Sequence, residues 1–222
     1  MTDVAGVDDA GRGPIIGPLV IAGIIIPRER VRDLREMGVK DSKMLTPFAR
    51  KQLRERIIAL AKVSVREAQP REIDDVVFHG VKLKKLNFLE ARMMAEVISD
   101  LRPPEVYVDA SDVNEERFGE TIRSFLSNDM RNIKIVSKHH ADKNYLPVSA
   151  ASIIAKTHRD HAIELLHNDY GDFGSGYITD PKTMEFLRQY RRSHSEYPPI
   201  VRVSWKTAKE VEDELGQSRL GA

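Results

Sequence analysis

The sequence predicts an α/β fold in which helices surround a central mixed β-sheet. Two apolar segments near the N-terminus flank a glycine-rich turn, which predicts a hairpin. Segments with strand-like and helix-like patterns then alternate, as is typical of strands joined by helical crossovers. The chain has 222 residues, of which 41% are hydrophobic and 31% charged. This length buries a large core without disulfides, and the chain contains no cysteine.

The expected strands are apolar runs bounded by glycine, proline or charged residues. Residues 4–8 form the first strand, which ends in Asp8 and Asp9. Residues 18–27 are rich in β-branched side chains and form a second, buried strand. Further strands are expected at residues 63–68, 105–109 and 133–137.

The expected helices show apolar residues every three or four positions. Thr46 followed by Pro47 predicts a helix start, because threonine is a favourable N-cap and proline fits the first turn. A long helix is expected at residues 81–101. The other expected helices cover residues 48–62, 114–126, 147–168, 183–192 and 206–215. We expect one domain over residues 1–222, with a C-terminal helical part from about residue 180.

The charge pattern and the apolar runs narrow the class of protein. The formal net charge is only +1, but residues 27–62 are rich in bases and residues 90–120 in acids. The basic stretches could bind a polyanion if they share a face, or they could be ordinary solvated helix faces. The longest apolar run, residues 19–26, is far shorter than the ~20 residues of a membrane span. No leader pattern opens the sequence, so we expect a cytoplasmic protein without membrane association.

Four carboxylates stand where strands end or a helix is about to begin: Asp8, Asp9, Asp109 and Asp142. Ligands gather at strand ends in sheets with helical crossovers. Oxygen ligands suit Mg²⁺ or Mn²⁺, and two such ions support phosphoryl transfer. Each acid alone could instead be a helix cap or a surface charge. Asp8 and Asp9 point to opposite sides of an extended strand, so a kink is needed for both to bind one ion.

Six blocks of sequence follow one another between residues 4 and 207. They are GVDDAGRGP at 6–14, VKDSK at 39–43, VYVDASDV at 106–113, SAASIIAK at 149–156, GDFGSGY at 171–177 and SWKT at 204–207. In this order they resemble the signature of type 2 ribonuclease H (RNase HII), in its archaeal-like form. The resemblance covers nearly the whole chain.

The resemblance implies an RNase H-like fold and an endonuclease. Its expected substrates are the RNA strand of RNA–DNA hybrids and single ribonucleotides embedded in duplex DNA, which are cut on their 5′ side. Products would carry 5′-phosphate and 3′-hydroxyl ends. The acids Asp8, Asp9, Asp109 and Asp142 match the family's catalytic metal ligands, which implies two Mg²⁺ or Mn²⁺ ions. The family usually has glutamate where this chain has Asp9, which bears on rate and metal preference.

The resemblance also implies a set of substrate-binding residues. Gly11, Arg12 and Gly13 match the loop that recognises the ribose 2′-hydroxyl, and Tyr177 matches a tyrosine that packs on the next sugar. Lys43 matches a contact with a phosphate of the DNA strand. Without the resemblance, Gly11, Arg12 and Gly13 are equally well a tight turn with a surface arginine. A tyrosine such as Tyr177 is more commonly a half-buried structural residue, and a lysine such as Lys43 is usually solvated.

The expected partners are nucleic acids, and the expected state is a monomer. The segment Gln217-Ser218-Arg219-Leu220 begins like a sliding-clamp peptide, but no aromatic pair follows it, so no clear clamp peptide is predicted. Two alternatives remain. One is another RNase H-like nuclease, such as a DNA junction resolvase. The other is a non-catalytic protein that binds RNA–DNA hybrids.

Overall fold

The computed structural model describes residues 2–39, 46–80 and 85–220, with side chains up to residue 216. The chain divides into two compact units. Unit 1 comprises Met1–Ala10, Val20–Glu67 and Lys82–His158, and unit 2 comprises Gly11–Leu19, Ala68–Val81 and Arg159–Ala222. The expectation of one domain over residues 1–222 stays a prediction.

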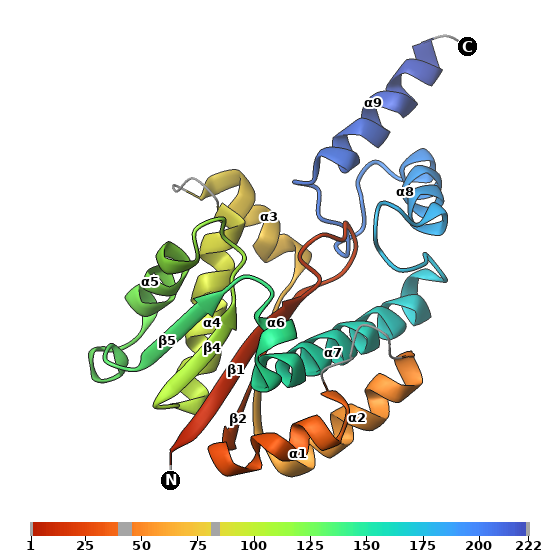
Figure 1. Cartoon of the computed structure of the whole chain (residues 1–222). Coiled ribbons are helices and arrows are strands. Elements are labelled where there is room, and N and C mark those ends of the chain that lie inside the picture. Colours follow the sequence, from red (N-terminus) through yellow and green to blue (C-terminus); the bar gives the residue numbers. More distant parts are fainter. Residues whose placement is uncertain (1, 40–45, 81–84, 221–222) are drawn as a thin grey trace. The chain divides into compact units, whose positions relative to one another are not determined.

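A five-stranded mixed sheet forms the centre of unit 1 (Figure 1). Its strands are β1 (Asp3–Ala10), β2 (Leu19–Pro27), β3 (Lys62–Ala68), β4 (Glu105–Asp109) and β5 (Lys134–Lys138), in the order β3-β2-β1-β4-β5. β1 pairs antiparallel with β2 and parallel with β4, and β4 pairs parallel with β5. The five expected strands, the hairpin and the mixed sheet are therefore confirmed.

The helices of unit 1 connect and cover these strands. They are α1 (Val31–Glu36), α2 (Pro47–Leu60), α4 (Lys85–Leu101), α5 (Glu115–Phe125), α6 (Ala141–Asn144) and the first half of α7 (Leu146–Tyr170), with 3-10 turns η1 (Arg28–Arg30) and η3 (Asn128–Met130). The Ala49 amide donates to Thr46 Oγ1 at 3.2 Å, which confirms the predicted N-cap of α2. The expected start of α4, residues 81–84, lies outside the described residues.

Strand β2 is buried on both faces because nearly all of its residues are apolar. Its even-numbered residues between Val20 and Ile26 share one apolar cluster with residues of α1, α2 and α7. Gly23 faces the opposite side, where an added Cβ would contact Val97 of α4. Because side chains alternate along β2, one face of the strand packs against α1, α2 and α7 and the other face against α4.

Unit 2 has its own apolar cluster, which includes Ile16, Phe173 and Leu187. Its helices are α3 (Pro70–His79), the second half of α7, α8 (Pro181–Ser193) and α9 (Lys206–Leu220). Helix α3 is not among the expected helices, although Pro70 occupies its first turn, where proline is common. Helix α9 extends five residues beyond the expected end at 215. None of the helices in the described part of the chain is long and apolar enough to cross a membrane.

Candidate active site

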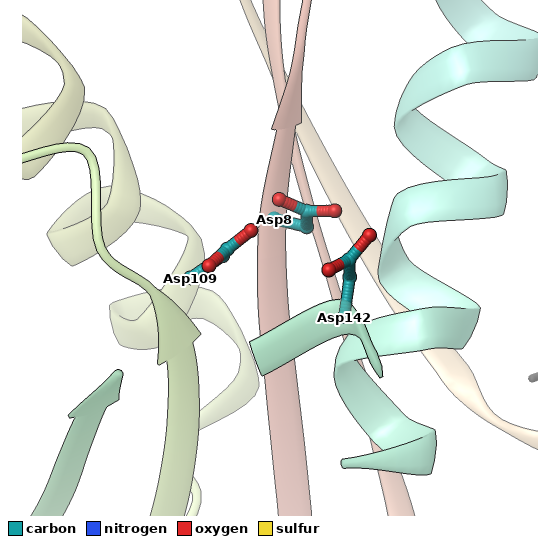
Figure 2. Close-up of side chains that lie close together, drawn as sticks. All are labelled: Asp8, Asp109 and Asp142. Atoms are coloured by element: carbon teal, nitrogen blue, oxygen red, sulfur yellow. The ribbon is translucent and has the colours of Figure 1, made fainter. Parts of the chain in front are cut away.

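Three carboxylates from separate parts of the chain converge in unit 1 (Figure 2). Asp8 lies in β1, Asp109 is the last residue of β4, and Asp142 lies in α6. One oxygen of each carboxylate lies within 4.8 Å of those of the other two. β1 and β4 are parallel neighbours with Val7 opposite Val108, so the next residue of each strand brings an acid to the same place.

Hydrogen bonds fix the turn that brings Asp142 to the other two acids. His140 precedes α6 with left-handed backbone, φ 54°. The Ala141 amide donates to Asp109 Oδ1 at 3.0 Å. The buried Ser149 hydroxyl, on α7, donates to the Asp142 carbonyl. The end of β4 and the start of α7 therefore hold α6, and with it the third carboxylate.

The Asp8 carboxyl is electrostatically unfavourable in the protein without metal. Its residue is 4% exposed. Burial, then the charge of Asp9, then that of Asp109 raise the pKa of Asp8 well above its ordinary value. Interactions with the Ser152 side chain and the Asp9 amide lower it only in part. A divalent cation would offset this repulsion, and a set of carboxylate oxygens is what Mg²⁺ and Mn²⁺ prefer. The residues present thus fit such an ion.

Asp9 is not one of the three acids whose oxygens lie within 4.8 Å of one another. Strand β1 continues without interruption to Ala10, so neighbouring side chains alternate between its faces. The charge of Asp9 nevertheless raises the pKa of Asp8 more than the charge of Asp109 does. Asp9 is therefore a close electrostatic neighbour of the three acids, and its part as a fourth ligand stays a prediction.

We expect Asp8→Asn to stabilise the metal-free protein at neutral pH by about 1 kcal/mol or more, because it removes a buried charge from among other acids. This is a rise in Tm of about 2–4 °C per kcal/mol for a chain of this size. A carboxyl whose folded pKa is raised costs stability as pH rises from its unfolded pKa to its folded pKa. The gain should therefore vanish below about pH 4 and grow above it.

Thermal melting in chelator, across pH, measures this effect. Asp3→Asn is the matched control, because Asp3 is exposed at the start of the same strand; its Tm should not change. Added Mn²⁺ should raise the Tm of the wild type more than that of Asp8→Asn. A lower Tm for Asp8→Asn in chelator at pH 7 contradicts the electrostatic account.

The glycine-rich loop, residues 11–17, and Tyr177 lie close together in unit 2. Gly11 has φ +86°, and a Cβ there would come within 2.5 Å of the Pro18 carbonyl oxygen, so the position requires glycine. A Cβ on the exposed Gly13 would lie 3.9 Å from the Tyr177 ring. Tyr177 is 40% exposed, and the Arg159 guanidinium carbon lies 4.9 Å from its ring centre. An accessible aromatic ring thus stands beside the loop.

The remaining predicted site residue, Lys43, lies outside the described residues. Two further residues of these sites are not predicted from the sequence, namely Ser149 and Arg202. Arg202 is fully buried and bonds to the backbone of the glycine-rich loop. The signal available was an arginine between Val201 and Val203, since arginine is rarely buried without dedicated partners.

Similar solved structures identify the class of protein that this fold and site define. The ribonuclease H2 of Pyrococcus horikoshii OT3 matches with a TM-score of 0.87 and 43% identity, covering 96% of this chain and 98% of that one. The RNase HII solved in a PCNA complex from Archaeoglobus fulgidus matches with a TM-score of 0.83 and 38% identity, covering 94% and 96%. The fold and its carboxylates define a metal-dependent ribonuclease H.

The sequence comparisons identify the family to which the chain belongs. The family model for ribonuclease HII matches residues 5–208. The ribonuclease HII of Thermococcus sibiricus is 44% identical over 219 residues, which cover 97% of this chain and 94% of that protein. The chain belongs to the ribonuclease HII family, and the predicted family, fold and enzyme class are confirmed.

Proposed function

We propose that this enzyme cleaves the RNA strand of RNA–DNA hybrids and cuts 5′ of single ribonucleotides in duplex DNA, leaving 5′-phosphate and 3′-hydroxyl ends. The observation that carries the proposal is the close approach of Asp8, Asp109 and Asp142 in a chain of the ribonuclease HII family. Thiolate nucleophiles and thiolate metal sites are excluded because the chain has no cysteine.

The chain's own acids determine where the chemistry takes place. Asp8, Asp109 and Asp142, with Asp9 beside them, would hold two Mg²⁺ or Mn²⁺ ions. Such ions supply an activated water for in-line attack on the phosphate and stabilise the leaving 3′-oxygen. Asp8 and Asp142 are buried, and Asp109 is half-buried and the most accessible of the three acids. No side chain is required as a general base.

In unit 2, the loop Gly11–Gly13 and Tyr177 would contact the ribonucleotide. The 2′-hydroxyl is the group by which a protein distinguishes RNA from DNA at one position. Glycines allow backbone groups to approach it closely, and the Arg12 guanidinium can bind a phosphate. The exposed face of Tyr177 offers a surface to a sugar. Lys43 stays proposed as a contact with a DNA-strand phosphate.

The test uses two duplexes, one with a single ribonucleotide in DNA and one a uniform RNA–DNA hybrid. Each is incubated with Mg²⁺, Mn²⁺ or chelator, and the product ends are mapped. Metal-dependent cleavage 5′ of the lone ribonucleotide supports both parts of the proposal. Cleavage of the hybrid alone supports the nuclease and contradicts the recognition of single ribonucleotides.

An all-DNA four-way junction separates the remaining alternatives. Cleavage of that junction, which has no 2′-hydroxyl, would favour a resolvase-like nuclease. Tight binding of the hybrid without cleavage in either metal would favour a non-catalytic binding protein.

We expect Asp9→Glu to retain or raise activity, because glutamate is the family's usual residue at this position. The extra methylene changes the reach of the carboxylate, and metal coordination tolerates shifts of only a few tenths of an ångström. The measurement is kcat/KM in Mg²⁺ and in Mn²⁺, with Asp9→Asn as the control that removes the charge. A loss of about a hundredfold in Asp9→Glu would mean that the site has adapted to the shorter acid.

We further propose that the enzyme acts as a monomer and has no clear clamp peptide. The Archaeoglobus fulgidus relative was solved in complex with PCNA. In this chain, residues 217–222 read Gln-Ser-Arg-Leu-Gly-Ala, with no aromatic residue among them. Gel filtration with and without PCNA from a related archaeon tests both statements, since co-elution through this segment would overturn the second.

A further inference from the structure

Arg202 is a buried cation whose guanidinium donates hydrogen bonds to one loop. Its residue is 0% exposed. Nη2 donates to the Gly11 carbonyl at 2.6 Å and to the Gly17 carbonyl at 2.8 Å. Nε donates to the Gly17 carbonyl at 3.0 Å, and Nη1 donates to the Arg12 carbonyl at 3.0 Å. The planar guanidinium thus holds three backbone carbonyls of the glycine-rich loop at once.

Trp205 completes this arrangement from the same stretch of chain. Its indole Nε1 donates to the Gly13 carbonyl at 3.2 Å. The Arg202 guanidinium carbon lies 5.0 Å from the centre of the Trp205 ring, so the two side chains also stack. The carbonyls of three consecutive residues, Gly11, Arg12 and Gly13, are therefore all bonded by these two side chains.

The stretch that carries Arg202 and Trp205 is itself held in place. The Arg202 amide donates to the Ile15 carbonyl at 2.8 Å. The buried Asp74 carboxylate on α3 accepts from the amides of Val203, at 3.0 Å, and Ser204, at 2.9 Å. The two side chains are thus presented from a fixed backbone rather than from a free loop.

Burying a guanidinium is unfavourable unless its donors are used. Desolvation, then the charge of Arg159, lowers the pKa of Arg202 to about 9, and Asp74 opposes this only in part. The group therefore stays charged at neutral pH. An uncharged side chain in this place would avoid the desolvation cost but would not supply a planar fork of donors.

Because the peptide bond is planar, the hydrogen bonds that Arg202 makes to these carbonyls also fix the direction of the following N–H groups. In a trans peptide, the carbonyl and the following N–H point in opposite directions. Because the Gly11 carbonyl points to Arg202, the Arg12 amide N–H points away from it. The Arg12 carbonyl fixes the Gly13 N–H in the same way. Two backbone N–H groups of the loop beside Tyr177 are thereby directed away from Arg202.

We propose that Arg202 and Trp205 are positioning residues that set the peptide planes of Gly11–Gly13 for recognition of the ribonucleotide. This inference rests on the proposed function, in which that loop contacts the 2′-hydroxyl. A duplex with one ribonucleotide offers a single 2′-hydroxyl, whereas a uniform hybrid offers one at every position. Loss of loop alignment therefore penalises the first substrate more than the second.

The test uses Trp205→Phe, which keeps a smaller aromatic ring but removes the indole N–H, and Arg202→Lys, which keeps the charge and removes the fork. Arg191→Lys is the matched control: Arg191 also donates to a carbonyl, that of His194, and lies 5.3 Å from the Tyr197 ring centre in the same unit. We expect kcat/KM on the single ribonucleotide to fall about tenfold for Trp205→Phe and about a hundredfold for Arg202→Lys. On the uniform hybrid, kcat/KM should fall by less than about threefold in each variant. The control should keep the wild-type ratio of kcat/KM between the two substrates.

Equal losses on both substrates together with a lower Tm would show a merely structural role and overturn the proposal. The ¹H–¹⁵N shifts and amide exchange of Arg12 and Gly13 in the full-length protein provide a readout independent of activity. Both should change in the two variants and not in Arg191→Lys. If they do not change, the positioning role is wrong even where the enzyme cleaves. If they change while the wild type ignores single ribonucleotides, the positioning stands and the proposed recognition fails.

Discussion

Asp109→Asn is expected to fold normally and to lose metal-dependent cleavage by about a thousandfold or more, because it removes one of the carboxylates that we propose hold the catalytic metal. Asp109 ends β4 and supplies one of three carboxylates whose oxygens lie within 4.8 Å of one another. The amide of asparagine keeps an oxygen that can accept from the Ala141 amide, as Asp109 Oδ1 does at 3.0 Å. The substitution therefore removes only the charge that we propose binds the cation.

Single-turnover cleavage of the uniform hybrid in Mg²⁺ and in Mn²⁺ measures the loss, and melting in chelator checks the fold. Asp112→Asn is the control, because Asp112 lies three residues further on and pairs with Arg117 instead. That variant should cleave within about threefold of the wild type. Wild-type rates in Asp109→Asn would contradict the assignment of this carboxylate to the metal site.

Local patterns are sufficient to predict most elements of the fold. The apolar run of β2 and the N-cap at Thr46 depend on neighbouring residues alone, and both elements begin within one residue of the position that the pattern predicts. The four-residue helix α6 is not predicted, because a left-handed residue and a bond to Asp109 from across the sheet fix it. The order of the strands is likewise a property of tertiary packing.

The candidate site shows the same division. The positions of acids at strand ends predict Asp8 and Asp109 as ligands, but spacing alone does not show that β1 and β4 are neighbours. Side-chain alternation gives a reason why Asp9 is absent from the group of three, and the charge on Asp9 still reaches Asp8. Arg202 bonds to Gly11, 191 residues away, and no local pattern carries that information.

Gly6 belongs to a strand that local pattern predicts, but the need for glycine there comes from tertiary packing. Its replacement is expected to have the largest effect on stability. It stands in the middle of β1, opposite Ile24 on one side and Tyr107 on the other. A Cβ at Gly6 would lie 2.1 Å from the Pro147 carbonyl carbon and 2.3 Å from the Val148 amide nitrogen. These are backbone atoms of α7, so no side-chain rotation relieves the contact.

We therefore expect Gly6→Ala to cost about 4 kcal/mol or more, as overpacking against backbone is at the severe end of single substitutions. This corresponds to a fall in Tm of about 10 °C in a chain of this length. Gly216→Ala is the control, because nothing lies within 4 Å of a Cβ there and alanine favours a helix. Its Tm should be equal to or above that of the wild type.

Gly6→Ala should also impair the site in whatever fraction folds. The contact can be relieved only by moving the first turn of α7 away from β1, and the Ser149 hydroxyl of that helix holds the Asp142 carbonyl. Such a shift separates Asp142 from Asp8, which lies two residues after Gly6 in β1. The folded fraction should therefore gain less thermal stability from Mn²⁺ than the wild type does. A Tm within about 2 °C of the wild type would mean that β1 and α7 are not packed this closely.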